Sequence, residues 1–561
     1  MKTEKLINTA LSREAPDLVV KNARIINVFS GEIISGDIAV TDGIIVGVGN
    51  YSGKREIDAG NRYVAPGFIN AHLHVESSMV TPEVYAEEEL RQGTTTIITD
   101  PHEIANVGGV DALKDMMRAA KQSCLNYYVM LPSCVPCTPF EHSGAVLNAE
   151  ELLVFQNEEC VLGLAEMMNS AGVLNLDETV MKKIAAFSDQ MIDGHAPMLY
   201  GKNLNAYASA GIATDHESVS FEEALNKIRC GIAVLIREGS ASKNLESIVK
   251  GIVENAVDTS RFAFCTDDKH LADIRKEGTI RHHIKKSVQL GLDPVQAIQM
   301  ATINAAVIYG LKHIGAVACG YRADMVIFDD FEHMNIKAVL KDGIPIEELP
   351  KTKRVSYSPA LLNSVNPGAL SSTAFEIEKR DQYSVIQVVE NQIITQKCVV
   401  SHQELLQGLA DGTIRKIAVI ERHKATGHYA AAYMKGYGLE HGAIAATVAH
   451  DSHNIIVVGD NDSDMYCAVS ELRKINGGYT VIRDGKAVAS LPLELGGLMS
   501  LCDADEFIPK LDEIIEIAYD MGVNRNIDPF ITLSFMALPV LPELRITDCG
   551  LFDVDSFKFT E

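Results

Sequence analysis

Two histidines separated by a single residue are the first sign of chemistry in this chain. His72 and His74 end an apolar run of strand type, PGFINAHLH. Because side chains alternate between the two faces of a strand, both imidazoles point to the same side. Two converging imidazoles can bind a metal ion. An isolated His-x-His is about as often a chance pair, so the interpretation depends on the residues further along the chain.

Strand-like runs alternate with helical ones through the middle of the chain. The runs are 68–74, 94–100, 126–132, 161–166, 191–195, 212–216, 232–237 and 262–267. Such an alternation over roughly 250 residues is typical of a (β/α)8 barrel of the TIM type. In that fold the active-site groups lie at the C-terminal ends of the strands.

Most of these runs close on a polar side chain that could do chemistry. The closing residues are His74, Asp100, Glu166, His195, His216 and Asp267. Any one of them alone is usually a turn or cap former. Histidine, however, is not a favoured turn residue. A Glu and two further histidines at strand ends therefore predict a metal site at the mouth of the barrel.

Several neighbouring residues are weaker candidates. Asp267 and Asp268 could be an N-cap pair for the next helix. Asp100 precedes a proline and could simply shape that turn. His102 and Glu103 lie near the predicted site but do not close a strand.

Composition sets limits on the partners. The chain has 561 residues, 47% of them hydrophobic, and 75 acidic against 50 basic residues give a formal net charge of -25. Such acidity disfavours nucleic acid or an anionic membrane as a partner and favours a neutral or cationic small substrate. It could also serve only solubility.

Cysteine usage and hydropathy bear on location. The 11 cysteines are scattered, and the C-x-x-C of Cys134 and Cys137 has no second pair at finger spacing. We interpret them as ordinary thiols, which fit a reducing compartment. No signal peptide precedes the first strand and no apolar run reaches membrane length, so we expect a cytoplasmic protein.

The barrel is flanked by short strands on both sides. Residues 17–58 form strand-like runs with Asp-Gly turns, and similar runs return at 323–329 and 336–343. We predict one small β-sandwich domain built from residues 1–65 and 313–350, with the barrel at 66–312.

A third unit begins where the composition changes after Pro350. We predict a C-terminal α/β domain over residues 351–561, beginning with a linker rich in Ser, Asn, Pro and Gly. It carries the cluster His450-Asp451-Ser452-His453. This cluster could bind metal, line the mouth of the barrel or form a surface turn.

These strand-end residues resemble the amidohydrolase superfamily and, within it, the bacterial adenine deaminases. The runs that carry the resemblance are AHLHVESSM at 71–79, TDPHEIANV at 99–107, GLAEMMN at 163–169, DGHAP at 193–197, TDHES at 214–218, REGSA at 237–241, CTDD at 265–268, the AT-x-N-AA run at 301–306 and AHDSHN at 449–454. The resemblance covers nearly the whole chain.

The resemblance implies two divalent metal ions. Their ligands would be His72, His74, Glu166, His195, His216 and Asp267. Glu166 stands where many members of the superfamily carry a bridging carbamylated lysine, and its carboxylate could bridge directly. Manganese is the expected metal, with iron(II) as an alternative and zinc less favoured. A homodimer is the expected assembly.

The implied reaction is hydrolytic deamination of adenine to hypoxanthine and ammonia. Asp267 would act as general base and then general acid. Glu217 is a candidate proton donor to the purine ring, although it could equally be a solvated loop residue.

Other functions stay open at this point. An amidohydrolase acting on another heterocycle or on a cyclic amide would share the same metal ligands. A non-catalytic metal-binding scaffold could also keep the fold. The zinc deaminase class is disfavoured, because it requires P-C-x-x-C and Ser133 precedes Cys134 here.

Overall fold

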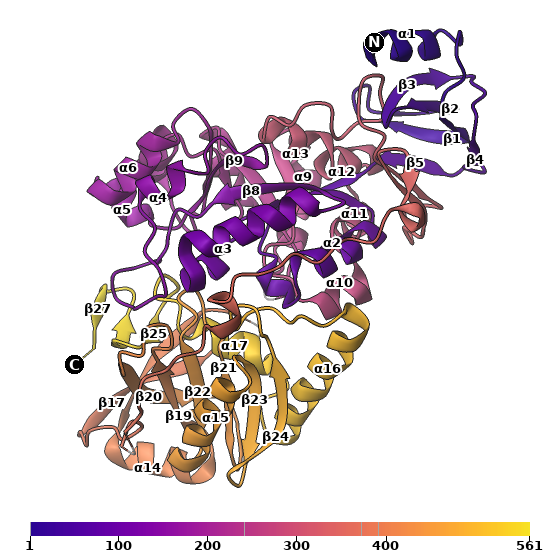
Figure 1. Ribbon diagram of the computed structural model, residues 1–561. Coiled ribbons are helices and arrows are strands. Elements are labelled where there is room, and N and C mark those ends of the chain that lie inside the picture. The colour runs from indigo at the N-terminus through magenta and orange to yellow at the C-terminus, as the bar shows by residue number, and fades with distance from the viewer. Residues whose placement is uncertain (1, 241, 372, 391, 561) are drawn as a thin grey trace.

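The structure is a computed structural model that describes residues 2–240, 242–371, 373–390 and 392–560. A barrel of parallel strands and surrounding helices occupies the centre of the molecule (Figure 1). A small β sheet that includes strands near the N-terminus lies at one end, and a C-terminal α/β unit lies at the other.

The barrel strands have the predicted order along the chain. They are β6 (Phe68–Leu73), β7 (Thr94–Thr99), β8 (Asn126–Leu131), β9 (Val161–Met167), β10 (Met191–Gly194), β11 (Thr214–Asp215), β12 (Ala233–Arg237) and β13 (Phe262–Cys265). They pair in parallel as β10-β9-β8-β7-β6 and β11-β12-β13. A bridge between Leu73 and Asp267 joins β6 to the chain after β13, and the amide of Ala213 donates to the Ile192 carbonyl at the other seam. The predicted TIM-like fold is confirmed.

Helices surround these strands. They are α2 (Pro82–Arg91), α3 (His102–Gln122), α4 (Ala149–Leu153), α5 (Ser170–Leu174), α6 (Glu178–Ala186), α7 (Gly201–Ser209), α8 (Phe221–Arg229), α9 (Leu245–Asn255), α10 (Leu271–Glu277), α11 (Ile280–Gln289), α12 (Pro294–Met300) and α13 (Ile303–Ile308). Inside the barrel, apolar side chains such as Ile98, Met130, Ala165 and Leu235 are buried in one cluster. This interior is packed, so reactive groups collect at its open end.

Strands from both flanks of the barrel share one sheet. Its strands are β1 (Leu18–Asn27), β2 (Glu32–Thr41), β3 (Ile44–Gly49), β4 (Glu56–Asp58), β5 (Tyr63–Pro66), β14 (Met325–Phe328), β15 (Ile336–Lys341) and β16 (Ile344–Pro345). The order is β16-β15-β14-β5-β1-β2-β3, with β4 on β1, and helix α1 (Lys2–Ala10) packs on this sheet. Antiparallel pairing of β14 with β5 brings the two flanks together.

The C-terminal unit is a mixed sheet with helices. Its strands are β17 (Gln382–Val388), β18 (Thr395–Ser401), β19 (Ile414–Ile420), β20 (Tyr429–Lys435), β21 (Ala443–Ala446), β22 (Ile455–Gly459), β23 (Gly478–Arg483) and β24 (Lys486–Pro492), and then β25 (Leu544–Thr547), β26 (Gly550–Asp553) and β27 (Lys558–Phe559) in a small sheet of their own. Its helices are α14 (His402–Asp411), α15 (Asp462–Lys474), α16 (Ala504–Asp520) and α17 (Pro529–Phe535).

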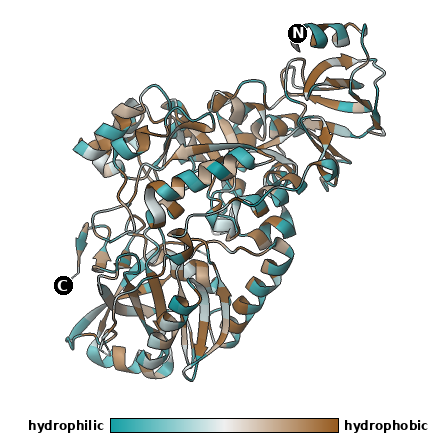
Figure 2. Cartoon of the chain, in the orientation of Figure 1, coloured by the Kyte–Doolittle hydropathy of each residue, from teal (hydrophilic) through white to brown (hydrophobic). Residues whose placement is uncertain are grey.

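Hydropathy matches this layering. Figure 2 shows apolar colour along the strands and mixed colour on the outer helices such as α3 and α16. Within the described part of the chain, the helices lack the combination of length and apolar character that a membrane crossing requires.

A buried ion pair anchors β11, the short barrel strand that His216 follows. Lys227 on α8 is fully buried and donates to Asp215 Oδ2 at 2.7 Å and to Glu223 Oε1 at 3.1 Å. Burial alone would raise the pKa of Asp215, but the Lys227 ammonium holds it at about 2. Asp215 in turn accepts the amide of Ala196 at 2.9 Å, next to His195.

Replacing Lys227 with Met should therefore destabilise the fold. Removing one member of a buried pair leaves an uncompensated charge, so we expect a loss of about 3–5 kcal/mol in the free energy of unfolding. Urea denaturation measures it. Lys250→Met, which breaks the exposed pair with Glu246, is the matched control and should change stability little. Equal stability of both variants would contradict the anchoring role.

Candidate functional site

The predicted ligands converge at the C-terminal end of the barrel strands. The structure brings together His72, His74, Glu166, His195, His216 and Asp267. His72 and Glu166 lie within the last residues of their strands, and the others come one or two residues after a strand. Parallel strands end at the same edge, so side chains from distant segments meet there.

Glu166 lies between two pairs of histidines. Its Oε1 lies 3.4 Å from His74 Nε2 and 3.8 Å from His72 Nε2. Its Oε2 lies 2.7 Å from His195 Nδ1 and 3.2 Å from His216 Nε2. Each carboxylate oxygen therefore faces its own pair of imidazoles, which is the arrangement that a bridging ligand needs.

Asp267 completes the group around the first pair. Its Oδ1 lies 3.2 Å from His74 Nε2 and 3.9 Å from His72 Nε2. Its Oδ2 accepts a hydrogen bond from Arg237 Nη1 at 2.8 Å. Arg237 also pairs with both oxygens of Glu217, with Nη2 2.9 Å from Oε2. One guanidinium thus fixes the two predicted catalytic carboxylates.

The ring nitrogens of these histidines are placed for metal binding. His74 Nδ1 lies 3.0 Å from the backbone carbonyl of Asp100, and a carbonyl can only accept, so Nδ1 carries a proton and Nε2 is the nitrogen that could bind a metal ion. Among the described residues, the buried Nε2 of His72 has no hydrogen-bond partner. His72, His74 and Asp267 offer ligand atoms within 4.8 Å of one another, as do His72, Glu166 and His216. Imidazole and carboxylate donors without thiolate suit divalent ions.

Burial and opposite charge compete at this site. Burial alone would raise the pKa of Glu166, yet the histidines, His216 foremost, hold it well below its usual range. Burial opposes protonation of His216, but the Glu166 carboxylate raises its pKa to about 9. Without metal, the site therefore favours an ionised Glu166 among partly protonated imidazoles.

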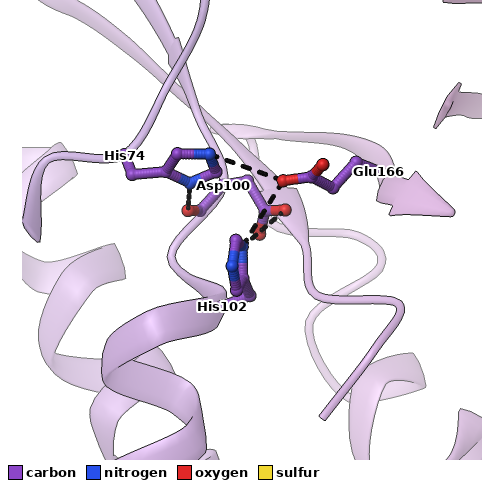
Figure 3. A group of neighbouring side chains, drawn as sticks. All are labelled: His74, Asp100, His102 and Glu166. Carbon is purple, nitrogen blue, oxygen red and sulfur yellow. Dashed lines mark hydrogen bonds and ion pairs between the residues drawn. The ribbon is translucent and has the colours of Figure 1, made fainter. Parts of the chain in front are cut away.

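The structure also brings in residues outside the predicted ligand set. Asp100 and His102 point toward Glu166 and His74 (Figure 3), and the His102 Nδ1 atom lies 3.1 Å from Asp100 Oδ2 and 3.7 Å from Glu166 Oε1. Asp100 comes directly after β7, so the strand-end rule already indicated it. Arg237 is the last residue of β12. His102 opens helix α3, a position with no comparable sequence signal.

The C-terminal unit covers the barrel mouth. The pocket around Glu166 is lined by side chains of that unit, which are Ile393, His450, Asp451, Phe535, Leu538 and Leu541. His450 Nδ1 lies 3.2 Å from Glu103 Oε1 of the barrel. The cluster at 450–453 is buried. The surface-turn interpretation is therefore wrong, and the cluster lines the mouth.

A larger cavity adjoins this pocket. It has a volume of about 870 Å³ and lies between the barrel and the C-terminal unit. Glu217, Arg237, Ser242, Ile393 and Leu541 line both spaces. The two spaces are therefore adjacent, with the ion-paired Glu217 and Arg237 at their junction.

Comparisons with known proteins agree with this geometry. The sequence profile of the amidohydrolase family matches residues 63–346, and that of the adenine deaminase C-terminal domain matches residues 389–558. An adenine deaminase of Desulfitobacterium hafniense is 46% identical over 99% of this chain and 98% of its own length. An adenine deaminase of Clostridium acetobutylicum is 46% identical over 99% of both chains.

The chain belongs to the adenine deaminase family of the amidohydrolases. It is an enzyme of the class that hydrolyses carbon–nitrogen bonds, in a metal-dependent family, and it carries a candidate metal site. The adenine deaminase C-terminal domain, matched over residues 389–558, coincides with the unit that covers the barrel mouth.

A buried carboxyl beside the C-terminal unit should give folding a pH dependence. Burial raises the pKa of Glu141 to about 8, from a usual value near 4.5. The folded state then binds more protons than the unfolded state between these values, so stability falls as pH rises through this window. The slope is about 1.4 kcal/mol per pH unit for one proton.

Glu141→Gln should remove this component. Urea unfolding at pH 5, 6, 7 and 8 measures it, and the variant should lose less stability across this range than the wild type. Glu254→Gln, at an exposed site, should reproduce the wild-type curve. Parallel curves for Glu141→Gln and the wild type would contradict the assignment.

Proposed function

We propose that this enzyme hydrolyses adenine to hypoxanthine and ammonia, with two divalent metal ions, preferentially manganese. Two observations support this proposal. The chain is 46% identical, over 99% of its length, to proteins named adenine deaminase, and histidines and carboxylates converge at the barrel mouth. His72, His74 and Asp267 would hold one ion, His195 and His216 the other, and Glu166 would bridge them.

Asp267 and Glu217 would take different proton-transfer steps. The bound ions would supply Lewis acidity that lets water ionise near neutral pH. Asp267, held by Arg237, accepts the proton from the attacking water at C6 of the purine and returns it to the departing amine. Water supplies the new C6 oxygen, and the amine leaves as ammonia.

Glu217 is placed to serve the purine ring. It lines the pocket and lies 3.7 Å from His195 Nδ1 and 3.6 Å from His216 Nε2. Both of its oxygens pair with Arg237, which positions the side chain beside the pocket. As proton donor to a ring nitrogen, Glu217 would act as the carboxylic acid and would recover its proton from the C6 hydroxyl as the carbonyl of hypoxanthine forms.

Apolar residues of the C-terminal unit would cover the heterocycle. Phe535, Leu538 and Leu541 face the pocket that contains Glu166 and Asp267. A planar purine gains from burial against such side chains, and exclusion of water strengthens the electrostatic interactions below it. The C-terminal unit thus contributes to binding rather than to the chemical step.

A turnover assay tests the proposal directly. Protein loaded with Mn²⁺ is mixed with adenine, guanine, adenosine or a cyclic amide, while purine absorbance and released ammonia are monitored. We expect turnover of adenine with one ammonia per hypoxanthine. Turnover of another compound with adenine untouched would reject adenine as the substrate. Inactivity on all of them with metal bound would reject the proposal.

Asp267→Asn tests the proton-transfer role. Loss of a general acid–base group should reduce kcat by roughly 10²–10⁴-fold. Because Asp267 is also a proposed ligand, bound metal is measured on the same sample. A variant that keeps its metal and its full kcat would exclude Asp267 as the general base.

A further inference from the structure

Arg545 is a fully buried arginine in the C-terminal unit. It lies on β25, and its exposed fraction is 0%. Within the described residues, every hydrogen bond of its guanidinium goes to a backbone carbonyl, and no carboxylate pairs with it. Burial without a counter-charge lowers its pKa to about 9, so the group is still a cation at neutral pH. Such a cation is costly, because it exchanges water for carbonyl dipoles alone.

The four carbonyls that Arg545 binds belong to three segments of the chain. Its Nε donates to the Leu541 carbonyl at 2.9 Å, and its Nη1 donates to the Phe535 carbonyl at 2.8 Å. Its Nη2 donates to the carbonyls of Ile393 at 2.9 Å and Pro542 at 2.8 Å. Phe535 ends α17, and Ile393 lies between β17 and β18. Leu541 and Pro542 lie in the connection from α17 to β25. One planar group therefore fixes the spacing of the three segments.

The same segments form the roof of the metal pocket. The side chains of Ile393, Phe535 and Leu541 line the pocket that contains Glu166. Ile393 and Leu541 also line the adjoining cavity of about 870 Å³, so they stand where the two spaces meet. Arg545 lines neither space. It can therefore act on a bound molecule only through the residues whose backbone it holds.

Other hydrogen bonds join two of these segments independently of Arg545. The amide of Thr395 donates to the Pro542 carbonyl at 3.0 Å, and its hydroxyl donates to the Leu544 carbonyl at 2.8 Å. The amide of Glu543 donates to the Thr395 carbonyl at 3.1 Å. These bonds remain when Arg545 is replaced. Its loss should therefore displace the roof while the C-terminal unit stays folded.

We propose that Arg545 is a positioning residue for substrate binding, which holds Ile393, Phe535 and Leu541 at the spacing where their side chains pack on the purine. The proposal rests on the proposed function for the identity of the substrate. A guanidinium suits this role because it has five N–H donors in one plane, which can bind carbonyls of several segments at once. The proposed metal ligands all belong to the barrel, so a displaced roof should affect binding more than the chemical step.

Arg545→Lys tests the role through the division between KM and kcat. Lysine keeps the positive charge, but its one nitrogen cannot reach all three segments. We expect KM for adenine to rise at least about 10-fold, the effect of losing one apolar contact in a pocket. The value of kcat and the bound Mn²⁺ should stay near those of the wild type. An unchanged KM, or a loss that lies in kcat, would overturn the proposal.

Arg415→Lys is the matched control. Arg415 is also buried in the C-terminal unit, and the hydrogen bonds of its guanidinium within the described residues go to the backbone carbonyls of Leu409, Ile414 and Leu439. None of these residues lines the pocket or the cavity. We expect Arg415→Lys to lose stability in urea but to keep the wild-type KM. A rise in KM in both variants would overturn the specific role of Arg545.

Leu541→Ala keeps the proposal testable if Arg545→Lys does not fold. This change shortens one side chain of the roof and leaves the hydrogen bonds of Arg545 in place, because they go to the backbone. We expect KM to rise here too. Both changes disturb the same contact, so the double variant should raise KM by less than the product of the two single effects. An unchanged KM in Leu541→Ala would overturn the proposal.

Hydrogen exchange separates this proposal from the proposed function, because it needs no substrate. We expect the backbone amides of residues 392–395 and 535–545 to exchange faster in Arg545→Lys than in the wild type or in Arg415→Lys. Faster exchange in a protein that turns over no adenine would reject only the proposed function. Adenine turnover with unchanged exchange and unchanged KM in Arg545→Lys would reject only the role of Arg545.

Discussion

The structure depends on keeping one carboxylate charged in the interior. Glu166 is 3% exposed, at the mouth of a barrel whose interior is apolar. An isolated carboxylate there would take up a proton, because burial disfavours the charged form. Histidines within 2.7–3.8 Å of its two oxygens reverse that preference. The same contacts direct imidazole and carboxylate atoms at common points. The histidines that keep Glu166 ionised therefore also create a geometry that can bind metal.

Two buried cations stabilise further carboxylates around Glu166 in the same way. Arg237 holds Asp267 and Glu217 together, and Lys227 holds Asp215 behind His195 and His216. Both cations are buried, so their removal would leave carboxylates unpaired in a low-dielectric environment. Such pairs contribute little net stability relative to apolar residues. Their effect is to restrict each ligand-bearing strand end to one position, which a site built from distant segments requires.

The C-terminal unit covers the open end of the barrel and lines the pocket there. His450 approaches Glu103, Asp451 faces His102, and Phe535 lines the pocket. Asn454 Nδ2 also donates to the carbonyl of His142 at 2.7 Å. Polar groups of this unit therefore orient barrel residues, while its apolar side chains exclude water.

The sequence alone determined the barrel and indicated most of the residues that meet at its mouth. Alternation with period two fixes the side on which His72 and His74 lie, and parallel strands must end at one edge, so Glu166, His195, His216 and Asp267 could be placed together from their positions along the chain. Those inferences need only local geometry and one rule of the fold. The positions of the strands could be predicted for the same reason, because buried strands are continuous apolar runs, although runs such as 212–216 proved longer than the strand Thr214–Asp215.

Only the tertiary structure decided the rest. His102 begins a helix, so its direction depends on how α3 packs, and no period in the sequence reports that. The partnership of Arg237 with Asp267 and Glu217 joins the ends of three neighbouring strands, β11, β12 and β13. The cluster at 450–453 left three interpretations open in the sequence, because contact with Glu103 spans more than 300 residues of chain. Such contacts are set by the packing of whole units, whose distances through space are not encoded in any local pattern.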